Sequence, residues 1–298
     1  MKKILLATGL FFALLLGAAR AESVAYMERF VDGIAVKIIC VDLNSPRVSI
    51  VPTLAAMPGQ GETFNSMVER LKPAAAINGT YFCVNTFKPV GAVFIEGKRK
   101  YRSPLGTAFA LTKDNRAFIF EHPWSGTLDH RKYKMVLSAG PRLLKDGVIS
   151  LDPYREGFRD RRIYAPAQRS ALGIKKDNKI LLVTVQKNIY LGRLAYTMKE
   201  LGCIDAMALD GGSSSALSFR GKVLLPPARR MSNILAVYEE EKNIVAAASP
   251  IKVSPAPAPL LRATPHPLLA DRRDSNAYRI LYPHPSMRPL LNYEPLRR

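Results

Sequence analysis

The chain has 298 residues and a formal net charge of +20, which suits one domain with a sizeable core and favours anionic partners. Nucleic acid is excluded as a specific partner, because the aromatic residues are not interleaved with basic runs. Three cysteines and four histidines, without metal-ligand spacing, exclude a disulfide scaffold and a His-rich zinc site.

The first 21 residues have the pattern of a secretory signal peptide. Lys2-Lys3 precede an apolar run that extends from Ile4 to Ala19, and Ala19-Arg20-Ala21 is a small-x-small cleavage pattern. An uncleaved membrane anchor is the alternative, but the run is short for a full span. We therefore expect export to the periplasm or the exterior, with no transmembrane span after cleavage.

Short β-branched runs between turn residues predict that most of the domain consists of strands and hairpins. Two expected hairpins share an Asp-Asn pair in the turn, where Asn tolerates left-handed backbone angles. The expected strands are Ile34–Val41 and Val48–Pro52, then the hairpin pairs Phe109–Leu111 with Ala117–Phe120 and Ala171–Ile174 with Ile180–Val185.

Two segments have the apolar period of a helix. The first is Thr63–Leu71, with Ser66-x-x-Glu69 as a candidate capping box and Pro73 as the stop. The second is Gly192–Leu201, which is followed by Gly202 at the position where glycine commonly ends a helix. Together with the hairpins, these helices predict an α+β fold with a mixed β-sheet core and few helices.

A short apolar strand follows each expected helix and then breaks into small polar residues. The strand Ala74–Ile77 runs into Asn78-Gly79-Thr80, and Ile204–Leu209 runs into Asp210-Gly211-Gly212. Strand ends of this kind are where α/β-type sheets place their sites. We expect both breaks to face one cleft. Asn78-Gly79-Thr80 also matches an N-glycosylation sequon, but its position between an apolar strand and Tyr81-Phe82 argues for burial.

The second break continues as a run of small residues, Asp210 to Ser215. Successive glycines and serines let backbone N–H groups converge into a concave nest that binds an anion. A tight β-turn that leads into the next hairpin is the alternative. Two arginines also stand at strand ends, Arg142 after Gly140-Pro141 and Arg169 before a strand, and each one alone reads as a surface charge.

The four stretches "NGTYF", "GPRLLKDG", "QRSALGI" and "LDGGSSS", with the closing "RRMSNILAVY", resemble the phosphodiester glycosidase family as an ordered set over about residues 74 to 238. The resemblance implies a single phosphodiester-glycosidase-like domain. It also implies cleavage of a sugar-1-phosphodiester between the anomeric carbon and the phosphate oxygen. One departure is Ser213, where the family usually has a third glycine. A positive φ at this position would strain a serine.

From the resemblance we assign Asp210 to the sugar, as nucleophile or electrostatic stabiliser, and Arg142 and Arg169 to the phosphate. Asn78 would bond a sugar hydroxyl or orient Asp210. The remaining expected substrate-binding residues are Gly79, Thr80, Tyr81, Gly140, Gly211, Gly212, Ser213, Ser214 and Ser215. The candidates for a second carboxylate are Glu96, Asp146 and Asp205.

The last 50 residues differ in composition from the rest of the chain. Residues 249–298 contain ten of the 22 prolines and have neither a helical nor a strand period. This composition predicts a disordered tail after a domain at 22–248.

Two other classes of function stay open. One is a non-catalytic envelope module that binds an anionic glycan, and the other is a metal-dependent phosphodiesterase in which Asp210 binds a divalent cation. The sequence does not identify the sugar, the aglycone or the oligomeric state, and it indicates no definite cofactor.

Overall fold

The computed structural model describes residues 22–103, 105–121 and 132–240. The expected signal peptide (1–21) and the expected tail (249–298) both lie outside the described residues. Within these ranges, no helix is long and apolar enough to cross a membrane.

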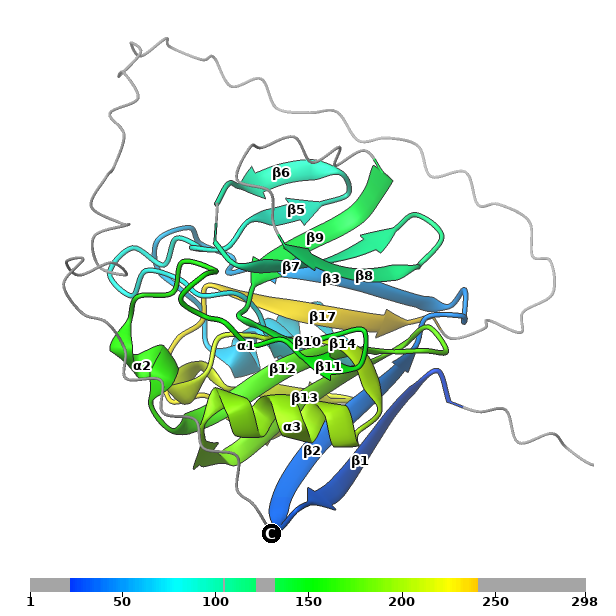
Figure 1. Cartoon of the computed structure of the whole chain (residues 1–298). Coiled ribbons are helices and arrows are strands. Elements are labelled where there is room, and N and C mark those ends of the chain that lie inside the picture. The colour runs from blue at the N-terminus through cyan, green and yellow to red at the C-terminus, as the bar shows by residue number, and fades with distance from the viewer. Residues whose placement is uncertain (1–21, 104, 122–131, 241–298) are drawn as a thin grey trace, which may run out of the picture.

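The described residues form three β-sheets (Figure 1). The seven-stranded sheet contains, in spatial order, β1 (Val24–Val31), β2 (Ile34–Asp42), β13 (Lys179–Ile189), β12 (Ala167–Lys175), β14 (Cys203–Ala208), β10 (Arg142–Lys145) and β11 (Val148–Ile149). One five-stranded sheet contains β16 (Lys222–Leu225), β15 (Leu217–Phe219), β4 (Ala75–Asn78), β17 (Asn233–Glu239) and β3 (Val48–Leu54). The other contains β6 (Lys98–Tyr101), β5 (Val93–Ile95), β9 (Tyr133–Ala139), β7 (Thr107–Thr112) and β8 (Ala117–Glu121).

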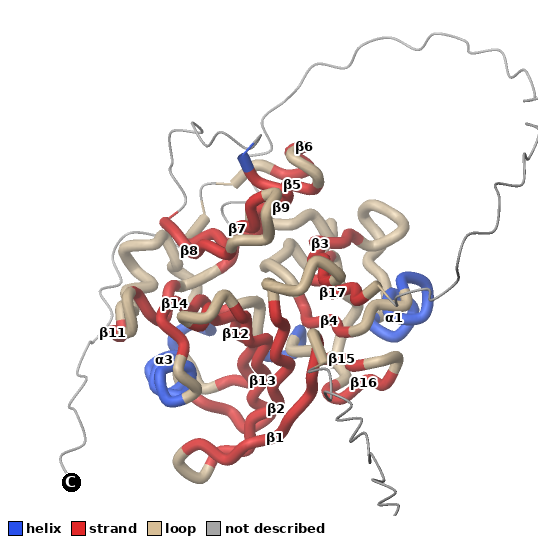
Figure 2. The backbone as a smooth tube through the Cα atoms, turned by 90° about the vertical axis from the view of Figure 1, so that its right-hand side faces the viewer, coloured by secondary structure: helices blue, strands red, loops and turns tan. Residues whose placement is uncertain are grey.

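The helices of the described residues are few, as expected. They are α1 (Phe64–Leu71), α2 (Arg161–Tyr164), α3 (Leu191–Glu200) and the 3-10 turn η2 (Gly212–Ser214). Seen from the side, α1 and α3 lie on opposite flanks of the strands (Figure 2). The described part of the domain is therefore mostly β-sheet, with α1 and α3 packed on the outside of the sheets.

The prediction of a mixed sheet is wrong, because every strand pair among the described residues is antiparallel. The two helix–strand units explain the difference. After α1, strand β4 inserts between β15 and β17, and it is antiparallel to both. After α3, strand β14 inserts between β12 and β10 in the same way. A helix before a strand is the sequence feature of a parallel crossover, but here each new strand joins neighbours of opposite direction.

The main core lies where the three sheets face one another. Its fully buried side chains come from all of them, including Leu172, Ile77 and Phe109. Helix α3 covers the other face of the seven-stranded sheet with Leu194 and Met198. Burying these apolar surfaces stabilises the domain by roughly 25 cal/mol per Å², and it holds the strand ends in fixed positions.

Helix α1 has the predicted extent but a different cap. It packs Phe64 and Met67 onto the sheet that contains β4. Its N-cap is Thr63, whose hydroxyl accepts a hydrogen bond from the Ser66 N–H at 3.2 Å. The predicted Ser66–Glu69 capping box is therefore wrong, because Ser66 already lies inside the first turn and serves as the donor.

The turn predictions based on left-handed backbone angles are confirmed. Asn115 and Asn178, in the turns of the two Asp-Asn hairpins, have φ values of 58° and 56°. Gly202, with φ 78°, follows the C-cap of α3. These positions need a positive φ, which Asn and Gly adopt at low cost.

Candidate active site

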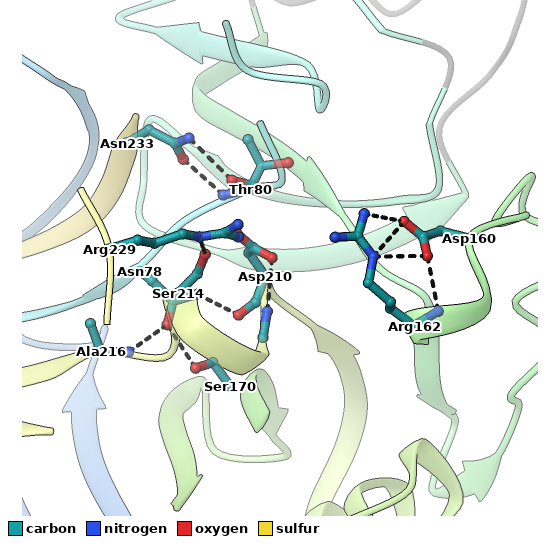
Figure 3. Close-up of polar contacts among 11 residues, drawn as sticks. Asn78, Thr80, Asp160, Arg162, Ser170, Asp210, Ser214, Ala216, Arg229 and Asn233 are labelled. Carbon is teal, nitrogen blue, oxygen red and sulfur yellow. Dashed lines mark hydrogen bonds and ion pairs between the residues drawn. The ribbon is translucent and has the colours of Figure 1, made fainter. Parts of the chain in front are cut away.

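The two polar breaks meet, although they lie far apart in the sequence. The Asp210 N–H donates to the Gly79 carbonyl at 3.2 Å, and Asn78 Nδ2 donates to the Asp210 carbonyl at 2.5 Å. The expectation that both breaks converge on one place is therefore met. Figure 3 shows the side chains that surround this junction.

Asn78 lies behind the junction and not on its surface. It is fully buried, and its Oδ1 accepts from Ser170 Oγ at 2.7 Å and from the Ala216 N–H at 3.1 Å. Of the two roles expected for it, the geometry favours orienting Asp210. Its amide connects three segments and fixes the backbone from which the Asp210 side chain projects.

Gly79 and Thr80 are also structural in this arrangement, and Asn233 is the residue that holds them. Asn233 Oδ1 accepts from the Thr80 N–H at 2.7 Å, and Asn233 Nδ2 donates to the Thr80 carbonyl at 3.1 Å. A Cβ on Gly79 would lie 2.0 Å from that Oδ1, so only glycine fits there. The sequence signal for Asn233 is a polar residue at the start of an apolar strand.

A pocket of about 340 Å³ opens in front of the junction. Charged side chains and an aromatic wall line it together. The lining residues include Tyr81, Phe82, Phe158, Arg159, Asp160, Arg162, Arg169, Asp210, Gly211, Gly212, Ser213 and Arg229. A larger groove of about 870 Å³ lies elsewhere, where the described chain begins and ends, and it contains none of the expected site residues.

Asp210 projects into this pocket from the end of β14 and is only 5% exposed. Its Oδ1 accepts from the Gly211 N–H at 2.9 Å, and its Oδ2 accepts from Arg229 Nη2 at 3.1 Å. Burial raises the pKa of Asp210, while the positive charge of Arg229 and a hydrogen bond from Ser214 oppose that rise. The carboxylate is thus shielded from water and held by hydrogen bonds from Gly211 and Arg229, and the positive charge of Arg229 partly neutralises it.

Arg229 is a site residue that was not among those expected from the sequence. It lies before β17, its Nε donates to Ser214 Oγ at 2.6 Å, and its guanidinium lies 4.8 Å from the centre of the Phe82 ring. The segment "RRMSNILAVY" already belonged to the family resemblance. That motif was the available signal, but the motif did not say which side chain reaches the carboxylate.

Arg169 is the predicted arginine that does line the pocket. It is 5% exposed, and backbone carbonyls hold two of its guanidinium nitrogens: Nε donates to Ile189, and Nη2 donates to Ile163 and Ala165. Among the described residues, no carboxylate pairs with it and no partner is found for Nη1. Burial accordingly lowers the pKa of Arg169, and Tyr81 opposes that effect. A buried cation without a counterion beside a pocket is suited to an anionic ligand.

Arg142 is not brought to this pocket, which corrects the expectation of two arginines on one phosphate. Its Nε donates to the Leu144 carbonyl at 3.0 Å, and its Nη2 pairs with Asp205. It lines a separate pocket of about 190 Å³ that also contains Glu156. The pairing register between β10 and β14 shifts between Arg142 and Leu144, and the Arg142 side chain is directed toward Asp205 at this irregularity.

The run from Gly211 to Ser215 does not form the open nest that we expected. The Gly211 N–H donates to Asp210, and the N–H groups of Ser214 and Ser215 close the 3-10 turn by donating to Gly211 and Gly212. Three of the five expected donors are therefore engaged within the chain. Ser214 and Ser215 are buried, and only Gly211, Gly212 and Ser213 line the pocket.

The departure at Ser213 carries no backbone strain. The residue with positive φ in this turn is Gly212, at 58°, and Ser213 is not among the positive-φ residues. Ser213 is exposed, and its carbonyl accepts from the Ala228 N–H at 2.9 Å. A serine is compatible with this position.

None of the three candidates for a second carboxylate lines the pocket. Glu96 and Asp146 occupy hairpin turns with φ values of 50°, and Asp205 pairs with Arg142. The second carboxylate of the pocket is Asp160, the N-cap of α2, whose Oδ1 accepts from the Arg162 N–H at 2.9 Å. The Arg162 side chain lowers the pKa of Asp160. A capping aspartate before a short helix was the signal in the sequence.

Tyr81 and Gly140 form the back of the aromatic wall. The Tyr81 hydroxyl donates to the Gly140 carbonyl at 2.8 Å, and its ring meets Phe158 edge-on at 5.6 Å. Tyr81 lines the pocket, whereas Gly140 lies behind it and donates to the Ala208 carbonyl. Gly140 therefore supports the wall without lining the pocket.

Cys40, Cys83 and Cys203 carry no disulfide. Across the described ranges, no group of three or more His, Cys, Asp or Glu side chains is placed to hold a metal ion.

A pocket that holds a buried carboxylate of shifted pKa together with a buried arginine is the usual candidate for an active site. The family comparison is consistent with an enzyme. The phosphodiester glycosidase family model matches residues 72–238, and the chain belongs to this family. Among curated proteins, the chain has no significant match.

Three solved structures show the same fold at low identity. A hypothetical protein from Synechocystis has a TM-score of 0.62 and 18% identity, over 73% of this chain and 62% of that one. The catalytic domain of zebrafish N-acetylglucosamine-1-phosphodiester alpha-N-acetylglucosaminidase, auto-inhibited by its pro-peptide, has 0.60 and 19%, over 74% and 85%. A putative exported protein from Burkholderia pseudomallei has 0.51 and 15%, over 69% and 74%.

This chain spans less than two thirds of the Synechocystis protein. All three identities are below 20%. These likenesses therefore support the fold alone.

Proposed function

We propose that this protein is an exported hydrolase that cleaves a sugar-1-phosphodiester in an envelope or extracellular glycan, at the bond between the anomeric carbon and the phosphate oxygen. One observation carries the proposal. The buried Arg169, which has no carboxylate partner among the described residues, shares a pocket with the buried carboxylate of Asp210. An anion site and a carboxylate side by side are what this bond cleavage needs.

In the proposed reaction, the C–O bond breaks and its electron pair leaves with the phosphate. Arg169 binds the phosphate through Nη1, and Arg229 adds a second positive charge at the Asp210 side of the pocket. Because a phosphate monoester leaves with little protonation, the main requirement is to stabilise positive charge that develops on the sugar. Asp210 supplies that negative charge. A water molecule then bonds to the anomeric carbon through its oxygen, and its second proton passes to the released phosphate monoester.

Asn78 and Ser214 support this chemistry without contacting the substrate. Asn78 fixes the backbone carbonyl of Asp210, and Ser214 accepts from Arg229 Nε. Groups held this way need little reorganisation when charge develops, which is how preorganised sites lower a barrier. Both are therefore positioning residues.

The test is hydrolysis of a panel of hexose-1-phosphate methyl diesters in ¹⁸O-labelled water. Label in the sugar product supports attack at carbon. Label in the phosphate would overturn the proposal in favour of a phosphodiesterase that attacks phosphorus, and parallel reactions with EDTA and with Mg²⁺ show whether a cation takes part. Binding of the diesters without turnover would instead indicate a glycan-binding module.

A further inference from the structure

A second arginine of the pocket also has no carboxylate partner among the described residues. Arg159 lines the pocket on the segment between β11 and α2, and it is half-buried. Its guanidinium lies 3.6 Å from the centre of the Tyr154 ring, and Nη1 donates to the carbonyls of Tyr154 and Phe158. The ring and the two carbonyls therefore fix the guanidinium plane.

The fixed orientation leaves one edge of Arg159 available. No partner among the described residues is found for Nε or Nη2, and these two nitrogens form the edge that binds an oxyanion in bidentate fashion. The neighbouring Arg162 differs, because its guanidinium is engaged by Asp160 (Figure 3). Arg159 thus presents an oriented edge without a partner among the described residues at the pocket wall.

The charged side chains of the pocket form two ion pairs and leave two arginines without a carboxylate partner among the described residues. Asp210 is matched by Arg229, and Asp160 is matched by Arg162. Two guanidinium groups, Arg169 and Arg159, are left without a carboxylate. A phosphodiester carries a single negative charge, so one diester leaves one of the two unmatched.

We propose that the substrate carries a second anionic group, a phosphate or a carboxylate on the aglycone, and that Arg159 binds it. This inference rests on the proposed function, since Arg169 takes the scissile phosphate. It defines the substrate class as a sugar-1-phosphodiester of an acidic aglycone, such as the next unit of a phosphate-linked or uronic acid-containing glycan. A neutral alcohol as aglycone would leave Arg159 unused.

Calorimetric titration with three product-side probes tests the inference without any need for turnover. Glycerol 3-phosphate offers one anionic group, 3-phosphoglycerate adds a carboxylate, and propane-1,3-diol bisphosphate adds a phosphate. We expect at least one of the two doubly anionic probes to bind the parent protein about tenfold more tightly than glycerol 3-phosphate, as one good charge-assisted contact allows. Which of the two binds more tightly identifies the second group.

The variants separate a specific contact from general attraction to a basic protein. Arg159→Gln should reduce the preference for the doubly anionic probe to within about twofold and leave glycerol 3-phosphate affinity unchanged. Arg161→Gln, an exposed arginine of α2 that does not line the pocket, is the matched control and should keep the preference. Arg159→Lys keeps the charge but lacks the planar fork, so it should lose most of the preference for the doubly anionic probe. If thermal melting shows that Arg159→Gln is unfolded, Arg159→Lys takes its place in the test.

Two results would overturn the inference: no preference in the parent protein, or a preference that survives in Arg159→Gln or Arg159→Lys. The proposed function fails separately. If Arg169→Lys binds glycerol 3-phosphate as well as the parent does, then the primary phosphate site is wrong, whatever Arg159 does.

Discussion

Arg229 and Asp210 form an ion pair inside the pocket, with Nη2 3.1 Å from Oδ2, and their side chains are 29% and 7% exposed. The two residues come from different sheets, since Asp210 follows β14 and Arg229 precedes β17. Their contact joins the two sheets at the strand ends. It also places a positive charge beside a buried carboxylate, whose charged form would be costly without a partner.

Asp210→Asn should stop hydrolysis while the protein stays folded. The amide has nearly the same shape but cannot stabilise positive charge on the sugar, so turnover should fall by roughly three orders of magnitude or more. Hydrolysis of a sugar-1-phosphodiester measures the loss, and thermal melting is the folding control. A fully active Asp210→Asn protein would remove this residue from the mechanism.

Arg169→Lys and Arg142→Lys should give opposite results, although both arginines are buried, at 5% and 7% exposure. At Arg169 the change removes the planar fork from the pocket, so the affinity for phosphate monoesters should drop about tenfold or more. At Arg142 the change disturbs the pair with Asp205, so the melting temperature should fall while affinity is kept. Equal effects on affinity would show that Arg142 also reaches the substrate.

The pH dependence of hydrolysis should report the environment of Asp210. Because burial raises the pKa of this carboxyl, the acid limb of kcat/KM should lie above the ordinary range for aspartate. Arg229 lowers that pKa, so Arg229→Gln should move the limb to higher pH. An acid limb that stays in place in Arg229→Gln would mean that another group controls it.

The same raised pKa gives a stability prediction with a definite sign. The folded protein binds the Asp210 proton more tightly than the unfolded chain, so this group contributes stability at pH below the unfolded pKa. That contribution is lost as the pH rises through the folded pKa. Relative to Asp210→Asn, the unfolding free energy of the parent protein should therefore fall as the pH rises from the unfolded pKa of Asp210 to its higher folded pKa. Denaturant unfolding of both proteins at several pH values measures the difference.

Substitution should lower stability at Gly212 but have little effect at Ser213. Gly212→Ala should cost about 1 kcal/mol, because the left-handed φ of 58° is unfavourable for alanine even though a Cβ would meet nothing within 4 Å. Ser213→Gly restores the usual family residue, but should leave turnover within about twofold and stability nearly unchanged. Urea unfolding and hydrolysis assays check both, and a large gain of activity in Ser213→Gly would contradict the unstrained geometry.

The sequence by itself determined the features that depend on neighbouring residues. Asn115 and Asn178 marked the two hairpin turns, and Gly202 marked the end of α3, because positive φ is restricted to a few residue types. The polar breaks at Asn78 and Asp210 marked the strand ends of the site, because each apolar run changes there to polar and small residues, although both side chains are buried. The ordered motifs also gave the family.

Only the tertiary structure decided which long side chains share the pocket. Arg142 and Arg169 look alike in sequence, since both stand at strand ends, yet Arg142 pairs with Asp205 elsewhere and only Arg169 lines the pocket with Asp210. Arg229 reaches Asp210 only because the end of β14 and the start of β17 meet at Asn78 and Asn233. The direction of an arginine depends on strand register and on packing between segments far apart in the chain. Local backbone preferences do not determine which distant segments meet, so they leave the direction of an arginine open.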